Sequence, residues 1–270
     1  MKNRISQLFN NLIGEKRAGL GIFITAGDPN LEISQKIFDS LPEFGADFIE
    51  LGMPFSDPMA DGPAIQASSL RALNQGMNLK KTLLMVKNFR KKDMKTPVIL
   101  MGYYNPIYQY GVKRFITDSQ NYGVDGFIIV DMPPEEDKEF VKYLKNTNMD
   151  LVKLLTPTTD EERLQKVLEN SSGFLYYVSV TGITGTKKAS IKEIEKSLNR
   201  IKIFTKLPIA VGFGISTQKQ IKEISNVANA AVVGSHIVKI IENEYTNNKN
   251  NLFNVEKVLN EVRTLSSGLN

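Results

Sequence analysis

One carboxylate stands within an apolar segment of the sequence. Glu50 interrupts the run Phe48, Ile49 and Leu51, which predicts a β-strand. Because side chains alternate between the two faces of a strand, Glu50 shares its face with Phe48. If that face points into the core, burial raises the pKa of the carboxyl group, and such a group can both donate and accept a proton near neutrality. An equally weighted alternative is a structural carboxylate that accepts hydrogen bonds from loop amides.

A second carboxylate, Asp61, follows eleven residues later in a loop rich in glycine and proline. It can approach Glu50 only if this loop, residues 52–62, folds inward over the end of the strand. An aspartate before Gly62 and Pro63 is also typical of a helix amino-terminal cap, and on the residues alone capping is the favoured interpretation. The same reasoning makes turn residues of three further aspartates that lie near prolines: Asp28, Asp57 and Asp131.

Glycines cluster after the last three predicted strands. They are Gly182 and Gly185, then Gly212 and Gly214, then Gly234, which precedes Ser235. Glycine lets backbone amides approach an anion closely, and a helix that begins at Ser235 directs its free amides at that anion. Barrels of alternating strands and helices hold phosphate groups at this place. Together the clusters predict a phosphate site.

Six apolar residues fall at predicted strand ends, and as a group they indicate a pocket for a flat aromatic substrate. They are Phe23, Met101, Ile128, Val130, Leu154 and Phe213. Lys153 precedes Leu154, so it must point to the opposite face, which argues against a Schiff-base lysine. His236 begins a predicted helix and is interpreted as a surface or capping residue.

A repeated order of elements positions these residues. A short apolar run, a loop and a longer amphipathic segment alternate along the chain, which is typical of a parallel sheet with helical crossovers. Eight strands are expected, over Leu20–Thr25, Phe48–Leu51, Val98–Met101, Gly126–Val130, Leu151–Leu155, Phe174–Val178, Ile209–Val211 and Ala230–Val233. Eight strands close a barrel whose active site lies at their carboxyl ends. We therefore predict the α/β class and a (β/α)₈ TIM barrel, with residues 1–270 forming a single domain.

Helical periodicity fills the intervals between these strands. Six helices are predicted over Leu31–Phe44, Asn78–Lys91, Glu135–Asn146, Glu161–Glu169, Ile191–Phe204 and Lys219–Val227. Another begins at Pro63 and ends before Gly76. An extra amino-terminal helix around Ile5–Leu12 is expected to cover the lower end of the barrel, and the polar run Asn247–Asn251 predicts a surface loop.

Composition excludes several functional classes. With 41% hydrophobic and 23% charged residues, the 270-residue chain has the composition of a soluble globular protein. It has no cysteine and one histidine, which excludes disulfides and thiolate chemistry and argues against a metal site. The net charge of +5 comes from lysines scattered among acids, so we expect a solvated surface and no nucleic-acid or membrane partner. Without a signal peptide or a membrane span, a cytoplasmic enzyme is expected.

The stretch from Glu50 to Gln66, ELGMPFSDPMADGPAIQ, resembles the signature of the tryptophan synthase alpha subunit family. Further matches follow in the family's order over nearly the whole chain. They are TAGDP at 25–29, YYNP at 103–106, DMPPEE at 131–136, TGITG at 181–185, GFGIS at 212–216 and GS at 234–235.

This resemblance implies cleavage of indole-3-glycerol phosphate to indole and glyceraldehyde 3-phosphate, without a metal or a cofactor in this chain. It places the catalytic roles on Glu50, Asp61 and Tyr176, and it replaces capping as our interpretation of Asp61. Thr184 falls in a mobile lid, residues 179–190, that closes over Asp61. The phosphate ligands fall on Gly185, Gly214, Gly234 and Ser235.

The resemblance also implies a partner, the pyridoxal-phosphate-dependent beta subunit, in an assembly of two alpha and two beta chains. The expected contacts are Phe55, Asp57, Pro58 and Asn105. The residues themselves support a contact surface, because the loop carries an apolar group too large to expose idly: Met53, Pro54, Phe55, Pro58 and Met59. The alternatives are another phosphate-binding barrel aldolase or isomerase, and a partner subunit without catalytic activity.

Overall fold

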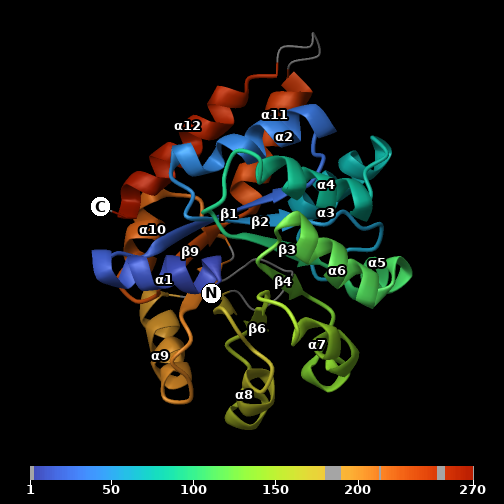
Figure 1. Ribbon diagram of the computed structural model, residues 1–270. Coiled ribbons are helices and arrows are strands. Elements are labelled where there is room, and N and C mark those ends of the chain that lie inside the picture. Colours follow the sequence, from blue (N-terminus) through green and yellow to red (C-terminus); the bar gives the residue numbers. More distant parts are fainter. Residues whose placement is uncertain (1–2, 180–189, 213, 248–252, 270) are drawn as a thin grey trace.

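The computed structural model describes residues 3–179, 190–212, 214–247 and 253–269, and it places a parallel β-barrel at the centre with helices around it (Figure 1). The strands are β1 (Gly19–Thr25), β2 (Phe48–Gly52), β3 (Val98–Gly102), β4 (Gly126–Ile129), β5 (Asp150–Leu151), β6 (Lys153–Leu155), β7 (Leu175–Val178), β8 (Ile209–Gly212) and β9 (Ala230–Val233). They pair in the order β5-β4-β3-β2-β1-β9-β8-β7-β6. The predicted parallel barrel is confirmed.

The barrel closes through the fifth predicted strand. That strand is divided into β5 and β6 by Val152, whose amide donates a hydrogen bond to the carbonyl of Phe127 at 2.9 Å. The two ends of the strand order are therefore one short stretch of chain. Eight predicted strands correspond to nine segments because of this single interruption.

The helices form the outer layer. They are α1 (Arg4–Glu15), α2 (Leu31–Ser40), α3 (Pro63–Asn74), α4 (Leu79–Phe89), α5 (Tyr104–Tyr110), α6 (Val112–Tyr122), α7 (Lys138–Leu144), α8 (Glu161–Leu168), α9 (Ile191–Lys202), α10 (Gln218–Ser225), α11 (Ser235–Asn247) and α12 (Val255–Ser266). Short 3₁₀ helices are η1 (Leu41–Phe44), η2 (Pro134–Glu136) and η3 (Ser267–Leu269). Within these described segments, no helix has the length and apolar character needed to cross a membrane.

Several helix predictions need correction. The helix predicted over Leu31–Phe44 becomes 3₁₀ from Leu41, because Pro42 has no amide to continue the α-helical ladder. The helix predicted over Glu135–Asn146 is η2 followed by α7, which begins at Lys138. Helix α5 begins within the YYNP match at 103–106, and α5, α6 and α12 are not among the predicted helices.

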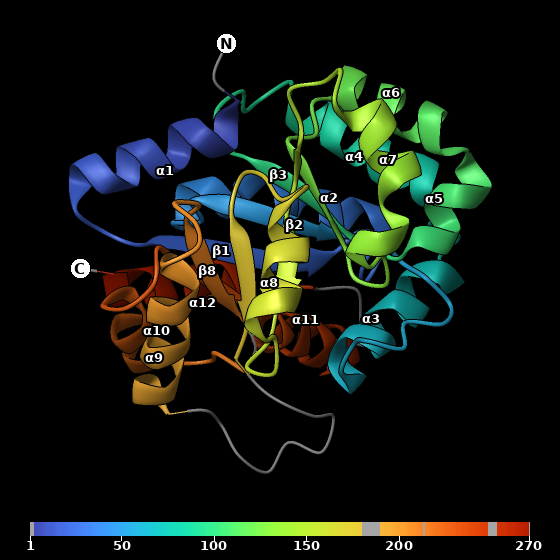
Figure 2. The ribbon, with the colours of Figure 1, turned by 90° about the horizontal axis from the view of Figure 1, so that it is seen from below.

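Aromatic side chains fill the lower half of the barrel. Phe48 at the start of β2 and Phe174 before β7 lie with their ring centres 5.5 Å apart, and Phe9 of α1 packs 5.5 Å from Phe174. Ile5 and Leu12 of α1 join the same cluster. Figure 1 shows α1 in front of the strands, and Figure 2 shows it to one side of them. The extra helix therefore covers the end at which the strands begin, as predicted.

Outside the barrel, an ion pair joins β6 to the start of α7. Lys153 Nζ lies 2.7 Å from Asp137 Oδ2, and both side chains are buried. Asn170 donates a second hydrogen bond to Asp137 at 3.0 Å. The lysine therefore points away from the barrel interior, as the alternation with Leu154 predicts. The break between η2 and α7 occurs at this aspartate.

We expect Asp137→Ala to lower the free energy of unfolding by about 3 kcal/mol, because it leaves the Lys153 ammonium buried without its carboxylate. Urea unfolding measures the change. Glu162→Gln is the matched control, because it removes the partner of Lys166 in an exposed pair on α8 and should change stability by less than about 0.5 kcal/mol. Equal small losses in the two variants would contradict a stabilising role for the buried pair.

Candidate active site

A cavity of about 120 Å³ opens within the upper part of the barrel, and most of the predicted site residues line it. Its wall comes from β1, β2, β3, β6 and β7 and from the segments that follow β2, β4, β8 and β9. The described lining residues are Phe23, Glu50, Ala60, Asp61, Gly62, Ile65, Met101, Val130, Leu154, Tyr176, Val178, Gly214, Gly234 and Ser235. Segments far apart in sequence therefore converge at one place, as the barrel requires.

Glu50 points into the barrel and is fully buried. Phe48 belongs to the interior cluster, whereas Ile49 and Leu51 pack in the outer core, so the strand alternation holds as predicted. Neither carboxylate oxygen of Glu50 has a hydrogen-bond partner among the described residues. Burial without compensation disfavours the charged form and raises the pKa of Glu50 to about 8.

Asp61 reaches the cavity because its loop folds inward. The hydroxyl of Tyr103 donates a hydrogen bond to Asp61 Oδ2 at 3.0 Å and accepts one from the amide of Ala60 at 2.9 Å. The amino-terminal cap of α3 is Gly62, so the capping interpretation of Asp61 is wrong. Burial raises the pKa of Asp61 to about 6, and the Tyr103 hydrogen bond opposes this rise.

Tyr103 contacts the candidate site through Asp61 but was not among the site residues predicted from the sequence. It lies two residues beyond Met101 of β3, so it continues the strand alternation that brings Met101 to the cavity. That periodicity is the signal that could have found it. Burial and the Asp61 carboxylate raise the pKa of Tyr103 above its usual value, so near neutrality its hydroxyl is protonated and can donate to the carboxylate.

Tyr176 of β7 brings a phenol to the two carboxylates. Burial raises its pKa well above the usual value, and the Glu50 and Asp61 charges raise it further, so the hydroxyl is neutral in the protein. Space for the hydroxyl depends on Gly212 of β8, because a Cβ atom there would lie 2.0 Å from the Tyr176 oxygen. A larger residue at position 212 would displace the phenol.

Three of the predicted phosphate ligands lie together at the cavity. Gly214 has a φ of 77°, a left-handed conformation that favours glycine, while Gly234 and Ser235 lie at the start of α11. The first amides of that helix have no carbonyl partner within the helix, and this suits an anion. Gly185, and Thr184 of the predicted lid, fall outside the described residues.

The predicted aromatic pocket is assembled in part. Phe23, Met101, Val130 and Leu154 line the cavity. Ile128 does not, because it is fully buried in the interior cluster. Phe213 lies outside the described residues.

The predicted contact residues lie on the rim of the barrel. Asp57 and Asn105 are exposed, Pro58 is half-buried, and the Phe55 ring packs 5.4 Å from the Tyr103 ring. The expected exposed apolar group is smaller than predicted. Met53 and Pro54 are buried because the chain continues the sheet beyond β2, where the Met53 amide donates to the Met101 carbonyl. Of this predicted apolar group, Met59 is the residue that is strongly exposed, with 78% of its surface accessible.

His236 takes part in a contact between helices. Its Nε2 lies 2.8 Å from Glu261 Oε1 of α12, and the side chain is partly exposed. This position agrees with the interpretation of a surface residue. Among the residues that the structure describes, no group of three His, Cys, Asp or Glu side chains is placed to hold a metal ion.

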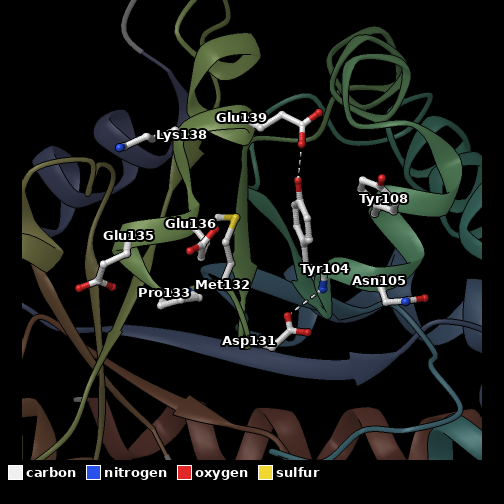
Figure 3. Close-up of a pocket in the computed structure, with 10 residues that line it drawn as sticks. All are labelled: Tyr104, Asn105, Tyr108, Asp131, Met132, Pro133, Glu135, Glu136, Lys138 and Glu139. Carbon is white, nitrogen blue, oxygen red and sulfur yellow. Dashed lines mark hydrogen bonds between the residues drawn. The ribbon is translucent and has the colours of Figure 1, made fainter.

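A larger groove, of about 820 Å³, lies on the rim between α5 and the segment that carries η2 and α7 (Figure 3). Four carboxylates line it, together with Tyr104 and Tyr108: Asp131, Glu135, Glu136 and Glu139. It contains neither Glu50 nor Asp61. The smaller cavity is therefore the candidate active site, since it brings together the carboxylates with raised pKa values.

The barrel and the cavity define a (β/α)₈ enzyme whose paired carboxylates lie where such barrels carry out their chemistry. The family model described as tryptophan synthase alpha chain matches residues 9–267, and the chain belongs to that family.

Solved structures agree with this assignment over the whole length. Tryptophan synthase subunit alpha from Legionella pneumophila is 34% identical with a TM-score of 0.91, and the match covers 100% of this chain and 99% of that one. A structure from Aquifex aeolicus is 34% identical with a TM-score of 0.88, covering 99% of each chain. A chain of Mycobacterium tuberculosis tryptophan synthase in an aminoacrylate-bound form is 27% identical with a TM-score of 0.87, covering 99% of this chain and 100% of that one.

The raised pKa of Glu50 predicts that stability depends on pH. Below about pH 4.5 the carboxyl group is neutral in both the folded and the unfolded chain. Between there and about pH 8 only the unfolded chain ionises, so the free energy of unfolding falls by about 1.4 kcal/mol per pH unit. Above pH 8 both states ionise and the loss stops growing.

We therefore expect Glu50→Gln to be more stable than the parent by an amount that grows from pH 5 to pH 8. Urea unfolding at pH 4.5, 6, 7 and 8 measures the difference. The lowest pH is the internal control, since the folded parent is then neutral at position 50 and the unfolded parent only half ionised, so the difference should be smallest there. A difference that does not change with pH would show that the carboxyl group is not desolvated in the folded state.

Proposed function

We propose that this chain cleaves indole-3-glycerol phosphate to indole and glyceraldehyde 3-phosphate as the alpha subunit of tryptophan synthase. One observation carries the proposal: the fully buried Glu50 carboxyl group has no hydrogen-bond partner among the described residues, and it shares a cavity with Asp61. Membership of the family supports the same reaction. The residues of the cavity then divide the work between them.

Glu50 is proposed as the acid and the base of the cleavage. Breaking the bond between indole C3 and its side chain requires a proton at C3, and it also requires removal of the proton from the adjacent side-chain hydroxyl. A carboxyl group with a pKa of about 8 is largely protonated at neutral pH, so it can deliver the first proton. The carboxylate that results can accept the second proton, and this restores the group for the next turnover.

Asp61 is proposed to assist from the other end of the ring system. Protonation at C3 draws electrons from the ring nitrogen and makes its N–H more acidic, and a carboxylate that accepts this hydrogen bond stabilises the positive charge. With a pKa of about 6, Asp61 is ionised at neutral pH while Glu50 is not. Two carboxyl groups whose environments separate their pKa values can take different roles.

Tyr176 and the glycine-rich segments are proposed to hold the substrate. The neutral Tyr176 phenol can donate a hydrogen bond to an oxygen of the reacting side chain without adding a further negative charge. The first amides of α11, with Gly214, Gly234 and Ser235, suit the phosphate. Gly185 and Thr184 are assigned to the phosphate and the lid by the resemblance alone.

The alternative of a lysine-dependent aldolase is not favoured. Lys153 is the lysine that precedes the cavity-lining Leu154 on β6. Its ammonium group, however, is held by Asp137 on the outer face of the barrel. A Schiff base needs an uncharged amine at the substrate. The buried ion pair keeps this lysine away from that role.

We propose that residues 1–270 act as one cytoplasmic catalytic domain without a cofactor of their own. The product indole would be consumed by a beta subunit that carries pyridoxal phosphate, in an assembly of two alpha and two beta chains. The family and the tryptophan synthase structures that resemble this chain support a beta-subunit partner. Phe55, Asp57, Pro58 and Asn105 are the proposed contacts.

We expect Glu50→Gln to bind substrate but to lose at least about a hundredfold in cleavage, because its shape is kept while proton transfer is removed. Asp61→Asn should lose less on analogues that need little assistance at the ring nitrogen. Indole release from indole-3-glycerol phosphate measures both losses. Glu195→Gln, at an exposed position of α9, is the matched control. Turnover of Glu50→Gln within about tenfold of the parent would reject its role.

The rim can couple a partner to Asp61 through Tyr103. Phe55 packs against the ring of Tyr103, and the Tyr103 hydroxyl contacts both Asp61 and the amide of Ala60. A partner that fixes the loop at Phe55 therefore also restricts the position of the carboxylate. Binding energy at the rim would then increase the rate of cleavage.

We expect a beta subunit to accelerate cleavage, and we expect Asp57→Lys to weaken its binding about tenfold without changing cleavage by the isolated chain. Asp57 is the sharper test, because a change at Phe55 would also disturb Tyr103. Titration with beta subunit, followed by indole release, measures both effects. Lys16→Glu, at the end of α1, is the matched charge reversal away from the rim. Unchanged affinity of Asp57→Lys would remove this loop from the interface.

A further inference from the structure

The carboxylate proposed to act on the indole ring depends on one tyrosine hydroxyl. Tyr103 donates to Asp61 and accepts from Ala60 N, so it ties the loop and its functional side chain to the end of β3. The Asp61 carboxylate accepts no other hydrogen bond that the described structure records, while the Asp61 backbone carbonyl accepts one from Gln66 Nε2 at 2.9 Å. The position of the Tyr103 backbone is therefore transmitted to Asp61.

Asp131 holds that backbone from the loop that follows the neighbouring strand β4. Its Oδ1 accepts a hydrogen bond from the amide of Tyr104 at 2.8 Å, and Figure 3 shows the carboxylate directed at this amide. The amide belongs to the peptide that joins Tyr103 to Tyr104. Asp131 is predicted from the sequence to be a turn residue, but its carboxylate contacts a different loop.

This contact extends the connection between β3 and β4 beyond the sheet. Gly102 pairs with Ile129, and the amide of Val130 donates to the carbonyl of Gly102 at 2.9 Å. The Asp131 contact comes next along the two chains. Tyr103, the amino-terminal cap of α5, makes no side-chain capping hydrogen bond, so Asp131 supplies an acceptor for the first amide of that helix from another loop.

We propose that Asp131 is a positioning residue for the cleavage, acting through Tyr103 on Asp61. The inference rests on the proposed function for its kinetic test. Loss of the carboxylate frees the Tyr103–Tyr104 peptide, and the hydroxyl then holds Asp61 and Ala60 less well. The amide oxygen of an asparagine can replace the carboxylate as acceptor, whereas alanine cannot.

The hydroxyl of Tyr104 provides a matched control, because it contacts a different carboxylate from the Tyr104 amide. It donates to Glu139 Oε2 at 3.1 Å, so Glu139→Gln alters a contact of the same tyrosine without touching the peptide held by Asp131 (Figure 3). Asp131 and Glu139 are both exposed, and both line the groove between α5 and α7. A general effect of charge or of rim stability would therefore appear in both variants.

The kinetic test is a double-mutant cycle on the full chain without a partner. Asp131→Ala should lower kcat for indole release about fivefold with less change in KM, while Asp131→Asn and Glu139→Gln stay within twofold of the parent. In the Tyr103→Phe background, Asp131→Ala should cause no further loss, because its effect passes through the missing hydroxyl. Independent, additive losses, or an Asp131→Ala variant within twofold of the parent, would overturn the proposal.

A second measurement does not require turnover. The Ala60 amide donates to Tyr103, so its hydrogen exchange, followed by NMR, reports the position of the hydroxyl. Exchange should become at least fivefold faster in Asp131→Ala and in Tyr103→Phe, and it should be unchanged in Asp131→Asn and Glu139→Gln. Unchanged exchange in Asp131→Ala would overturn the inference. A parent chain that releases no indole would instead reject the proposed function, and the exchange result would still decide the role of Asp131.

Discussion

Burial of the Glu50 carboxyl group, with no hydrogen-bond partner among the described residues, sets the conditions for the chemistry of this barrel. The group lies two residues above Phe48, on the same face of β2, where the aromatic lower core gives way to the cavity. A carboxyl group deeper in the core would be inaccessible to a substrate. A group higher on the rim would be solvated, and its pKa would stay near its usual value.

The ionisation of the second carboxyl group, Asp61, depends on a hydrogen bond from Tyr103 as well as on burial. Asp61 is less buried than Glu50 and accepts a hydrogen bond from Tyr103, which favours its ionised form against the effect of burial. This difference separates the two pKa values by about two units, around 8 and 6. The proposed acid therefore lies on a strand of the barrel, while the proposed assisting carboxylate lies on a loop at its rim.

Properties that depend on local periodicity could be predicted from the sequence. The inward face of Glu50, the outward face of Lys153 and the order of strands all follow from alternation and repetition of elements. The contacts of Asp61 could not be predicted in this way, because the residues before α3 are equally typical of a helix cap. The site role of Asp61 is implied by the family resemblance. Strand alternation beyond Met101 indicates the direction of Tyr103, but its contact with Asp61 depends on how the loop after β2 folds. Met53 was misplaced for the same reason, since its amide pairs with the carbonyl of Met101.

Strand alternation also links the cavity to the outer layer. Leu154 lines the cavity, and its neighbour Lys153 reaches outward to Asp137 at the start of α7. The segment between β4 and α7 is thus held at Asp137 by β6 and at Asp131 by the first amide of α5. Because one end of this segment is anchored in the buried layer and the other contacts the peptide that carries Tyr103, the outer packing of the barrel restricts a loop that contacts the proposed catalytic aspartate. The packing of Lys153 outside the barrel and the position of Asp61 at the cavity therefore both depend on the short strand β6.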